Sequence, residues 1–289
     1  MICVIKVAYE GSFFSGLQRQ PGHDTVQGHL ESALSRFFGR PIATTMAGRT
    51  DTGVHALAQV MAFFVEAPCD LEKLTHSLNA MARSPVAVLE AAILDDSSSF
   101  HPRHSALSRT YNYLIVDDCG YPGRLFWRGR AWTIGARLDL SKMRAATRSF
   151  LGEHDFTTYS YQPDETMTRV RKVTELSLQE EPLPTILPSD GRLLRLEITA
   201  NGFLRRMVRT LTSELVQVGL GQEAPETLAQ KLAAKDPELG PPAAPAHGLY
   251  FKAARYSPDP FKLGRQSGLF HRTKPSQSLN FQDRTGRLN

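Results

Sequence analysis

Cysteines and long apolar runs are scarce in this sequence. The three cysteines, Cys3, Cys69 and Cys119, are isolated and odd in number, so they offer neither a CxxC pair nor a disulfide framework. The most apolar stretches, such as residues 85–94, are too short and too interrupted to span a bilayer. The first residues, MICVIKVAYEGS, have no basic region and no small-residue cleavage site, so they are expected to begin a strand. These absences argue against a secreted disulfide scaffold and a membrane protein, and favour a reducing cytoplasm.

The net charge is also modest, and arginine placement is more informative than charge. The chain has 34 Lys and Arg against 29 Asp and Glu, with 41% hydrophobic residues, enough for a substantial core. Arginines lie beside aromatics or in clusters within SRTYNYLI, TRVRK and NGFLRRMVRTL. Because the guanidinium suits phosphates and base stacking, this favours a polyanion partner, with ordinary surface charge as the alternative.

The first hundred residues predict the element order β-α-β-β-α-β. Strand-like segments are expected at residues 2–10, 41–48, 55–67 and 86–94. A helix is expected after Thr25, which is a candidate N-cap, and is expected to end at Gly39. A second helix is expected after Asp70. This order is the split βαβ unit of ferredoxin-like and RNA-binding folds.

A second, similar pass of elements begins near Tyr111. Strands are expected at 109–117, 170–181, 193–203 and 249–256, and helices at 138–152, 204–221 and 225–236. We therefore predict an α+β protein of two ferredoxin-like, RRM-like halves that form one continuous, mostly antiparallel sheet flanked by helices. The predicted domains are 1–105 and 106–256. Residues 257–289 lack periodicity and are expected to form a flexible basic tail.

Residues 44–60, TTMAGRTDTGVHALAQV, place a polar turn between two apolar segments. Gly48 and Gly53 allow a sharp loop in which backbone can approach a ligand closely. Asp51 then lies at the apex of the loop, with Arg49 two residues away on the same side. The alternative is an aspartate that satisfies its own turn, with Arg49 as a surface partner.

Six segments in order carry a resemblance to a known family. They are AYEGSFFSGLQRQPGHDTVQGHLESAL, AGRTDTGVHALAQV, FHPRHSALSRTYNYLI, LGEHDFTTYS, NGFLRRMVRTL and HGLYFKAARY. Together the segments span roughly residues 2–256, and the chain resembles the tRNA pseudouridine synthase A family. Leu17, Thr52 and Thr210 depart from residues common in that family, and none of these departures removes a chemical group from the site.

The resemblance implies a reaction and assigns roles to four residues. Uridine in the anticodon stem-loop of tRNA, near positions 38 to 40, would be converted to pseudouridine by an isomerase that needs no cofactor and no metal. Asp51 would be the essential carboxylate, either attacking C1′ as a nucleophile or removing a proton from C2′. Arg209 would pair with Asp51, Tyr111 would stack near the target base, and Arg49 would replace the flipped nucleotide. The resemblance also implies a homodimer.

Two other kinds of function remain open from the residues alone. Paired RRM-like halves could bind RNA without catalysis, although a carboxylate facing RNA would weaken pure binding. A metal hydrolase could use His55, His101, His104 and Asp51, but Pro102 argues against a helix that presents the histidines together, and no HExxH motif is present.

Overall fold

The structure is a computed structural model that describes residues 1–82, 85–95, 97–161, 168–183 and 191–266. The N-terminal half contains β1 (Ile2–Tyr9), α1 (Val26–Phe38), β2 (Thr45–Met46), β3 (His55–Phe64), α2 (Leu71–Ala82) and β4 (Val86–Leu94). The β-α-β-β-α-β order predicted for this half is confirmed.

The second half has the predicted long elements and several short ones that the sequence did not reveal. It contains β5 (Ser108–Asp117), α3 (Tyr121–Phe126), β6 (Trp132–Thr133), α4 (Leu140–Thr147), β7 (Gly152–Asp155), β8 (Val170–Glu181), β9 (Arg192–Ala200), α5 (Met207–Gly219), α6 (Thr227–Ala234), β10 (Leu249–Arg255) and α7 (Pro260–Gln266). The unpredicted elements α3, β6, β7 and α7 have two to seven residues, too few for a hydrophobic period to emerge.

Local cap chemistry places the helix ends where the sequence indicated. The side chain of Thr25 accepts a hydrogen bond from the N–H of Gly28, and Gly39 ends α1 in the left-handed conformation with φ 69°. Asp70 accepts from the N–H groups of Glu72 and Lys73 at the start of α2. These bonds satisfy N–H groups that a helix leaves unpaired at its first turn.

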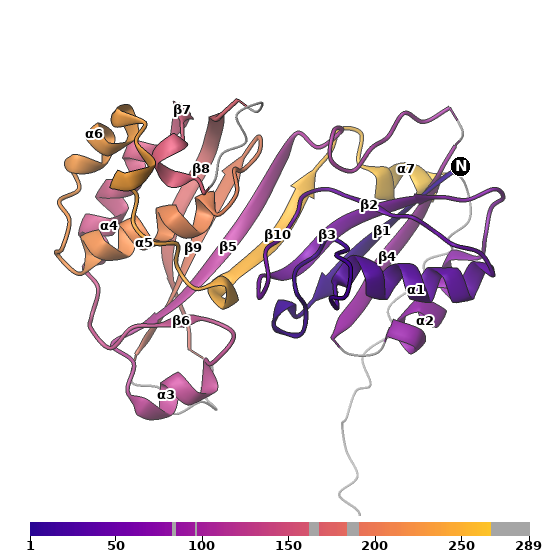
Figure 1. The fold of residues 1–289 in the computed structure, drawn as a ribbon, viewed down its shortest axis with the longest axis horizontal. Coiled ribbons are helices and arrows are strands. Elements are labelled where there is room, and N and C mark those ends of the chain that lie inside the picture. The colour runs from indigo at the N-terminus through magenta and orange to yellow at the C-terminus, as the bar shows by residue number, and fades with distance from the viewer. Residues whose placement is uncertain (83–84, 96, 162–167, 184–190, 267–289) are drawn as a thin grey trace, which may run out of the picture.

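Within the described residues, ten strands form a single sheet that runs through both halves. The strand order is β4-β1-β3-β10-β5-β9-β8-β7, with β2 paired to β3 and β6 paired to β5. Most pairs are antiparallel, as predicted, but β10 runs parallel to β3 and β6 runs parallel to β5. Figure 1 shows β5 and β10 in the middle of the molecule, with α1 and α2 beside the N-terminal strands and α4 to α6 beside the C-terminal ones.

The central position of β10 joins the two halves. Phe251 of β10 is paired with Ala56 of β3 on one side and with Tyr111 of β5 on the other. Tyr111 is in turn paired with Ile198 of β9. One row of residues therefore crosses the sheet from the strand that follows the polar turn to the strand that precedes α5. The domain boundary after residue 105 stays a prediction.

The segment expected to be a flexible tail begins with a packed helix. Phe261 of α7 is buried, and the ammonium of Lys6 lies 4.3 Å from the centroid of its ring. The remaining residues of the expected tail, 267–289, lie outside the described residues. No helix in the described part of the chain is long and apolar enough to cross a membrane.

Candidate active site

The polar turn between β2 and β3 is a tight reversal that begins at Asp51, with Thr52 and Gly53 as its central residues. The carbonyl of Asp51 accepts a hydrogen bond from the N–H of Val54 at 3.1 Å. Gly53 takes a φ of +80°, which is strained for residues with a side chain. The side chain of Asp51 is 36% exposed, so the carboxylate can reach a ligand.

The backbone of the turn is packed against the segment that follows β1. Leu17 donates its N–H to the carbonyl of Thr50 at 3.1 Å, and the Thr50 hydroxyl lies 2.7 Å from the hydroxyl of buried Tyr9. A Cβ atom at Gly11 would lie 2.0 Å from the carbonyl oxygen of Val54, so glycine is needed for this approach. The turn is therefore fixed on its inner side by main-chain and buried hydroxyl contacts.

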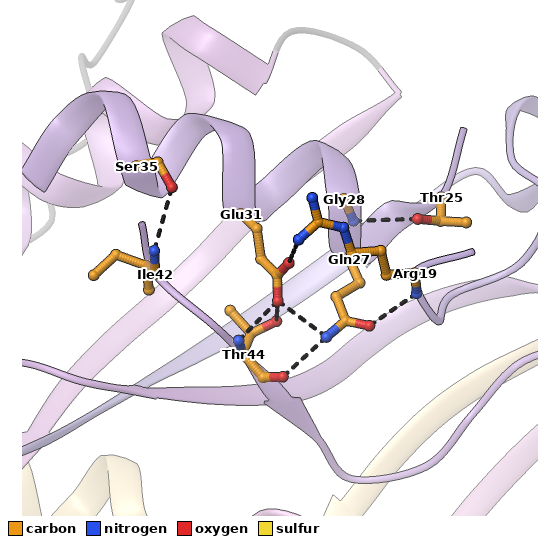
Figure 2. Close-up of polar contacts among 8 residues, drawn as sticks. All are labelled: Arg19, Thr25, Gln27, Gly28, Glu31, Ser35, Ile42 and Thr44. Carbon is orange, nitrogen blue, oxygen red and sulfur yellow. Dashed lines mark hydrogen bonds and ion pairs between the residues drawn. The ribbon is translucent and has the colours of Figure 1, made fainter. Parts of the chain in front are cut away.

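A polar network on α1 fixes the strand that leads into the turn (Figure 2). Glu31 is buried, and its Oε1 accepts from the Thr44 N–H at 2.8 Å, the Thr44 hydroxyl at 3.0 Å and Gln27 Nε2 at 3.0 Å. Gln27 also donates to the Thr44 carbonyl and accepts from the Arg19 N–H. Arg19 Nη1 lies 3.3 Å from Glu31 Oε2. Sequence reasoning missed this network, and the only signal was Gln27 and Glu31 at i, i+4 spacing on one helix face.

Arg209 reaches the turn from the other half of the chain. It lies in the first turn of α5, and its Nη1 is 3.5 Å from Oδ2 of Asp51. Nε donates to the carbonyl of Ala244 at 2.6 Å, which orients the guanidinium. Only 15% of the Arg209 side chain is exposed. Burial lowers its pKa and the Asp51 charge opposes that shift, so the guanidinium stays protonated beside the carboxylate.

Tyr111 lies beneath the start of the turn and is almost enclosed. Its exposed fraction is 7%, and its ring makes edge contacts with Phe203 at 5.1 Å and Phe251 at 5.2 Å between centroids. A Cβ atom at Gly48 would lie 3.9 Å from the Tyr111 hydroxyl. Burial is the main cause of a raised pKa for Tyr111, and the nearby hydroxyl of Tyr9 and carboxylate of Asp51 contribute, so the phenol is neutral at physiological pH.

The structure thus brings three of the four predicted site residues together and places the fourth at the surface. Asp51 contacts Arg209, and Tyr111 lies below the same turn. Arg49 is on the turn with its side chain exposed to solvent.

The histidines of the metal-hydrolase alternative are arranged differently. Gly11 donates its N–H to Nδ1 of His55 at 3.2 Å, and Nε2 of His55 lies 3.0 Å from the Gly129 carbonyl. Both ring nitrogens are therefore occupied, and burial lowers the pKa of His55. His101 accepts two main-chain N–H groups at Nδ1 and packs against His104. Among the described residues, no three or more His, Cys, Asp or Glu side chains are grouped to hold a metal.

Comparison with known proteins identifies the family. The family model described as tRNA pseudouridine synthase matches residues 5–103 and 146–257. The chain is 36% identical over 250 residues to tRNA pseudouridine synthase A of Pseudothermotoga lettingae, covering 86% of this chain and 97% of the relative. It is 37% identical over 246 residues to the Bacillus subtilis protein of that name, covering 84% and 94%. The Bordetella petrii protein of that name is 38% identical over 267 residues, covering 91% and 93%. The chain belongs to the tRNA pseudouridine synthase family.

Proposed function

We propose that this chain isomerises uridine to pseudouridine in the anticodon stem-loop of tRNA, near positions 38 to 40, with Asp51 as the catalytic carboxylate. The observation that carries the proposal is the exposed Asp51 carboxylate, 3.5 Å from a mostly buried arginine and held on a turn fixed on both sides. Its relatives are named for tRNA pseudouridine synthesis, and their similarity extends over most of the chain.

The reaction exchanges one bond for another within the nucleotide. The N1–C1′ bond breaks, the uracil turns, and C5 bonds to C1′, while the proton at C5 leaves and N1 gains one. No atom is gained or lost overall, so acid–base and covalent chemistry by side chains suffices. Arg209 orients the Asp51 carboxylate, and the neutral phenol of Tyr111 offers a hydrogen-bonding group below the turn.

Two routes for Asp51 can be separated by isotopic substitution. If the carboxylate attacks C1′, the C2′–H bond stays intact, and deuterium at C2′ changes the rate little. If it removes the C2′ proton on the way to a glycal, deuterium slows that step. Single-turnover rates with C2′-deuterated tRNA distinguish the two routes.

Asp51→Asn tests the proposal, with Asp118→Asn as a matched control. Asp118 also pairs with an arginine, Arg137, at 3.2 Å, but that pair is more exposed and lies after β5, at the end far from Tyr111; asparagine tolerates the positive φ of Asp118. Pseudouridine in unmodified tRNA is mapped by mass spectrometry after each enzyme is added. We expect Asp51→Asn to lose at least ~10⁴-fold in rate with tRNA affinity retained, as for removal of an essential catalytic group. An active Asp51→Asn variant would refute the catalytic role, and product outside the anticodon arm would refute the site assignment.

Two further expectations belong to this proposal. A homodimer would let one tRNA contact two subunits, and light scattering of the purified protein with and without tRNA measures its mass. A cytoplasmic location is part of the same proposal, is supported by the expected tRNA substrate, and can be tested by cell fractionation.

A further inference from the structure

Arg109, the second residue of β5, uses all its donors on main-chain carbonyls. Nε and Nη2 donate to the Ala47 carbonyl at 3.2 and 3.0 Å, and Nη1 donates to the carbonyls of Asn201 at 2.9 Å and Ala106 at 3.4 Å. Nη2 also donates to the carbonyl of Arg103. A guanidinium has five N–H donors, and these bonds account for all five.

This pattern is unlike a surface arginine or a phosphate contact. Among the described residues, every hydrogen-bond acceptor of Arg109 is a carbonyl, so no carboxylate neutralises it. A saturated guanidinium has no donor left for RNA. Its planar fork instead joins the nearby carbonyls of Arg103 and Ala106 to two that are distant in sequence, those of Ala47 and Asn201, which a flexible ammonium cannot do.

Two of the carbonyls that Arg109 bonds to lie on the chain segments that carry residues of the candidate site. Ala47 immediately precedes the turn, four residues before Asp51, and Asn201 follows β9, eight residues before Arg209. Arg109 is two residues before Tyr111 on the same strand, so both side chains lie on one face of the sheet. One side chain thus connects the chain segments that carry Asp51, Tyr111 and Arg209.

We propose that Arg109 is a positioning residue for the isomerisation, which sets the separation between the turn that carries Asp51 and the segment that carries Arg209. This inference rests on the proposed function for its kinetic consequence. Its structural consequence does not: loss of the fork should loosen the turn whether or not the reaction is the one proposed.

Arg109→Lys is the test, with Arg192→Lys as a matched control. Lysine keeps the charge but has three donors at one point, so it cannot hold all four carbonyls. Arg192 lies at the opposite end of the same strand pair, where its guanidinium is buried against both oxygens of Asp117 and the Leu138 carbonyl. Both substitutions remove a half-buried guanidinium fork, but only Arg109→Lys does so beside the turn.

Three measurements on the full chain decide the proposal. In Arg109→Lys we expect the single-turnover rate to fall ~10- to 100-fold, the cost of displacing reacting groups slightly, with tRNA affinity within about threefold of wild type. Combination with Arg209→Lys should cost less than the product of the two single losses, because both act on the same contact. Amide hydrogen exchange in peptides covering residues 44–56 should be faster in Arg109→Lys and unchanged in Arg192→Lys.

Contrary outcomes are equally specific. A wild-type rate and unchanged exchange in Arg109→Lys would overturn the proposal. So would equal rate losses in both variants, which would indicate general destabilisation, or a loss confined to tRNA affinity, which would indicate an RNA contact. If the wild-type protein formed no pseudouridine, the proposed function would fail, and the exchange experiment would still test the role of Arg109 in the turn.

Discussion

Replacing Tyr111 by phenylalanine removes only the hydroxyl of a buried residue below the turn that carries Asp51. The ring is held by edge contacts with Phe203 and Phe251, and phenylalanine keeps both. The hydroxyl lies close to Gly48, at the start of the turn. The substitution therefore changes one polar group and leaves the packing.

The structure separates the cost in stability from the cost in rate. A substitution that conserves volume in a core usually costs less than about 1.5 kcal/mol, whereas Tyr111→Ala would remove the ring and cost about 3–5 kcal/mol. A positioned acid or hydrogen-bonding group contributes roughly 10²–10⁴-fold in rate. We expect Tyr111→Phe to lose at least ~100-fold in single-turnover rate with nearly unchanged stability and tRNA affinity. Tyr111→Ala should also be destabilised.

The assay follows pseudouridine formation at saturating enzyme, together with thermal unfolding. Tyr159→Phe is the control, because Tyr159 is fully buried and its hydroxyl has no hydrogen-bond partner among the described residues. It should be as active as wild type and no less stable. The raised pKa of Tyr111 also predicts no loss of its proton near neutral pH. A wild-type rate in Tyr111→Phe, or an ionisation near pH 7 that disappears in that variant, would refute the reasoning.

Three other predictions follow from the contacts around the turn. In Arg209→Lys one ammonium cannot reach both Asp51 and the Ala244 carbonyl, so the single-turnover rate should fall ~10- to 100-fold with little change in tRNA affinity. A wild-type rate would contradict the role of Arg209 in orienting Asp51. Glu31→Gln removes the charge that Arg19 and Thr44 bond to and places an amide N–H among these donors, so the free energy of unfolding in urea should fall by about 1–3 kcal/mol. An unchanged urea midpoint would contradict this. Burial lowers the pKa of His55, so His55 binds a proton more readily in the unfolded chain than in the folded one. The free energy of unfolding should therefore fall as pH drops below about 6.5, and a urea midpoint that stays constant between pH 8 and pH 5 would contradict this.

Features that depend on a few neighbouring residues could be predicted from the sequence. Thr25 and Asp70 act as helix caps, and Gly39 ends α1, because a cap needs only the next turn of backbone. The polar turn at Asp51 follows for the same reason, since Gly53 allows the reversal locally. The order of the long elements likewise follows from their hydrophobic periods.

Features that depend on distant residues could not be predicted in this way. The position of β10 between β3 and β5 is set by pairing between residues that the sequence separates widely. The contact of Glu31 with Thr44 depends on α1 lying beside the segment before β2, and the bonds of Arg109 to the Ala47 and Asn201 carbonyls depend on how the two halves meet. Neither residue differs, in a single sequence, from an ordinary charged residue of a helix or a strand. The resemblance named Arg209 as a partner of Asp51, but only the structure shows that Ala244 orients it.

The position of β10 also determines when the site can form. The turn with Asp51 precedes β3, Tyr111 lies on β5, and β10 pairs with both strands. The Ala244 carbonyl that orients Arg209 lies just before β10, and Phe251 of β10 packs against Tyr111. Because β10 is the last described strand, these contacts require that nearly the whole chain has folded, and pairing over such sequence separations is slow. The N-terminal half has the element order of an independent domain, yet on its own it would present Asp51 without Tyr111 or Arg209. The candidate site is therefore a property of the complete sheet rather than of either half.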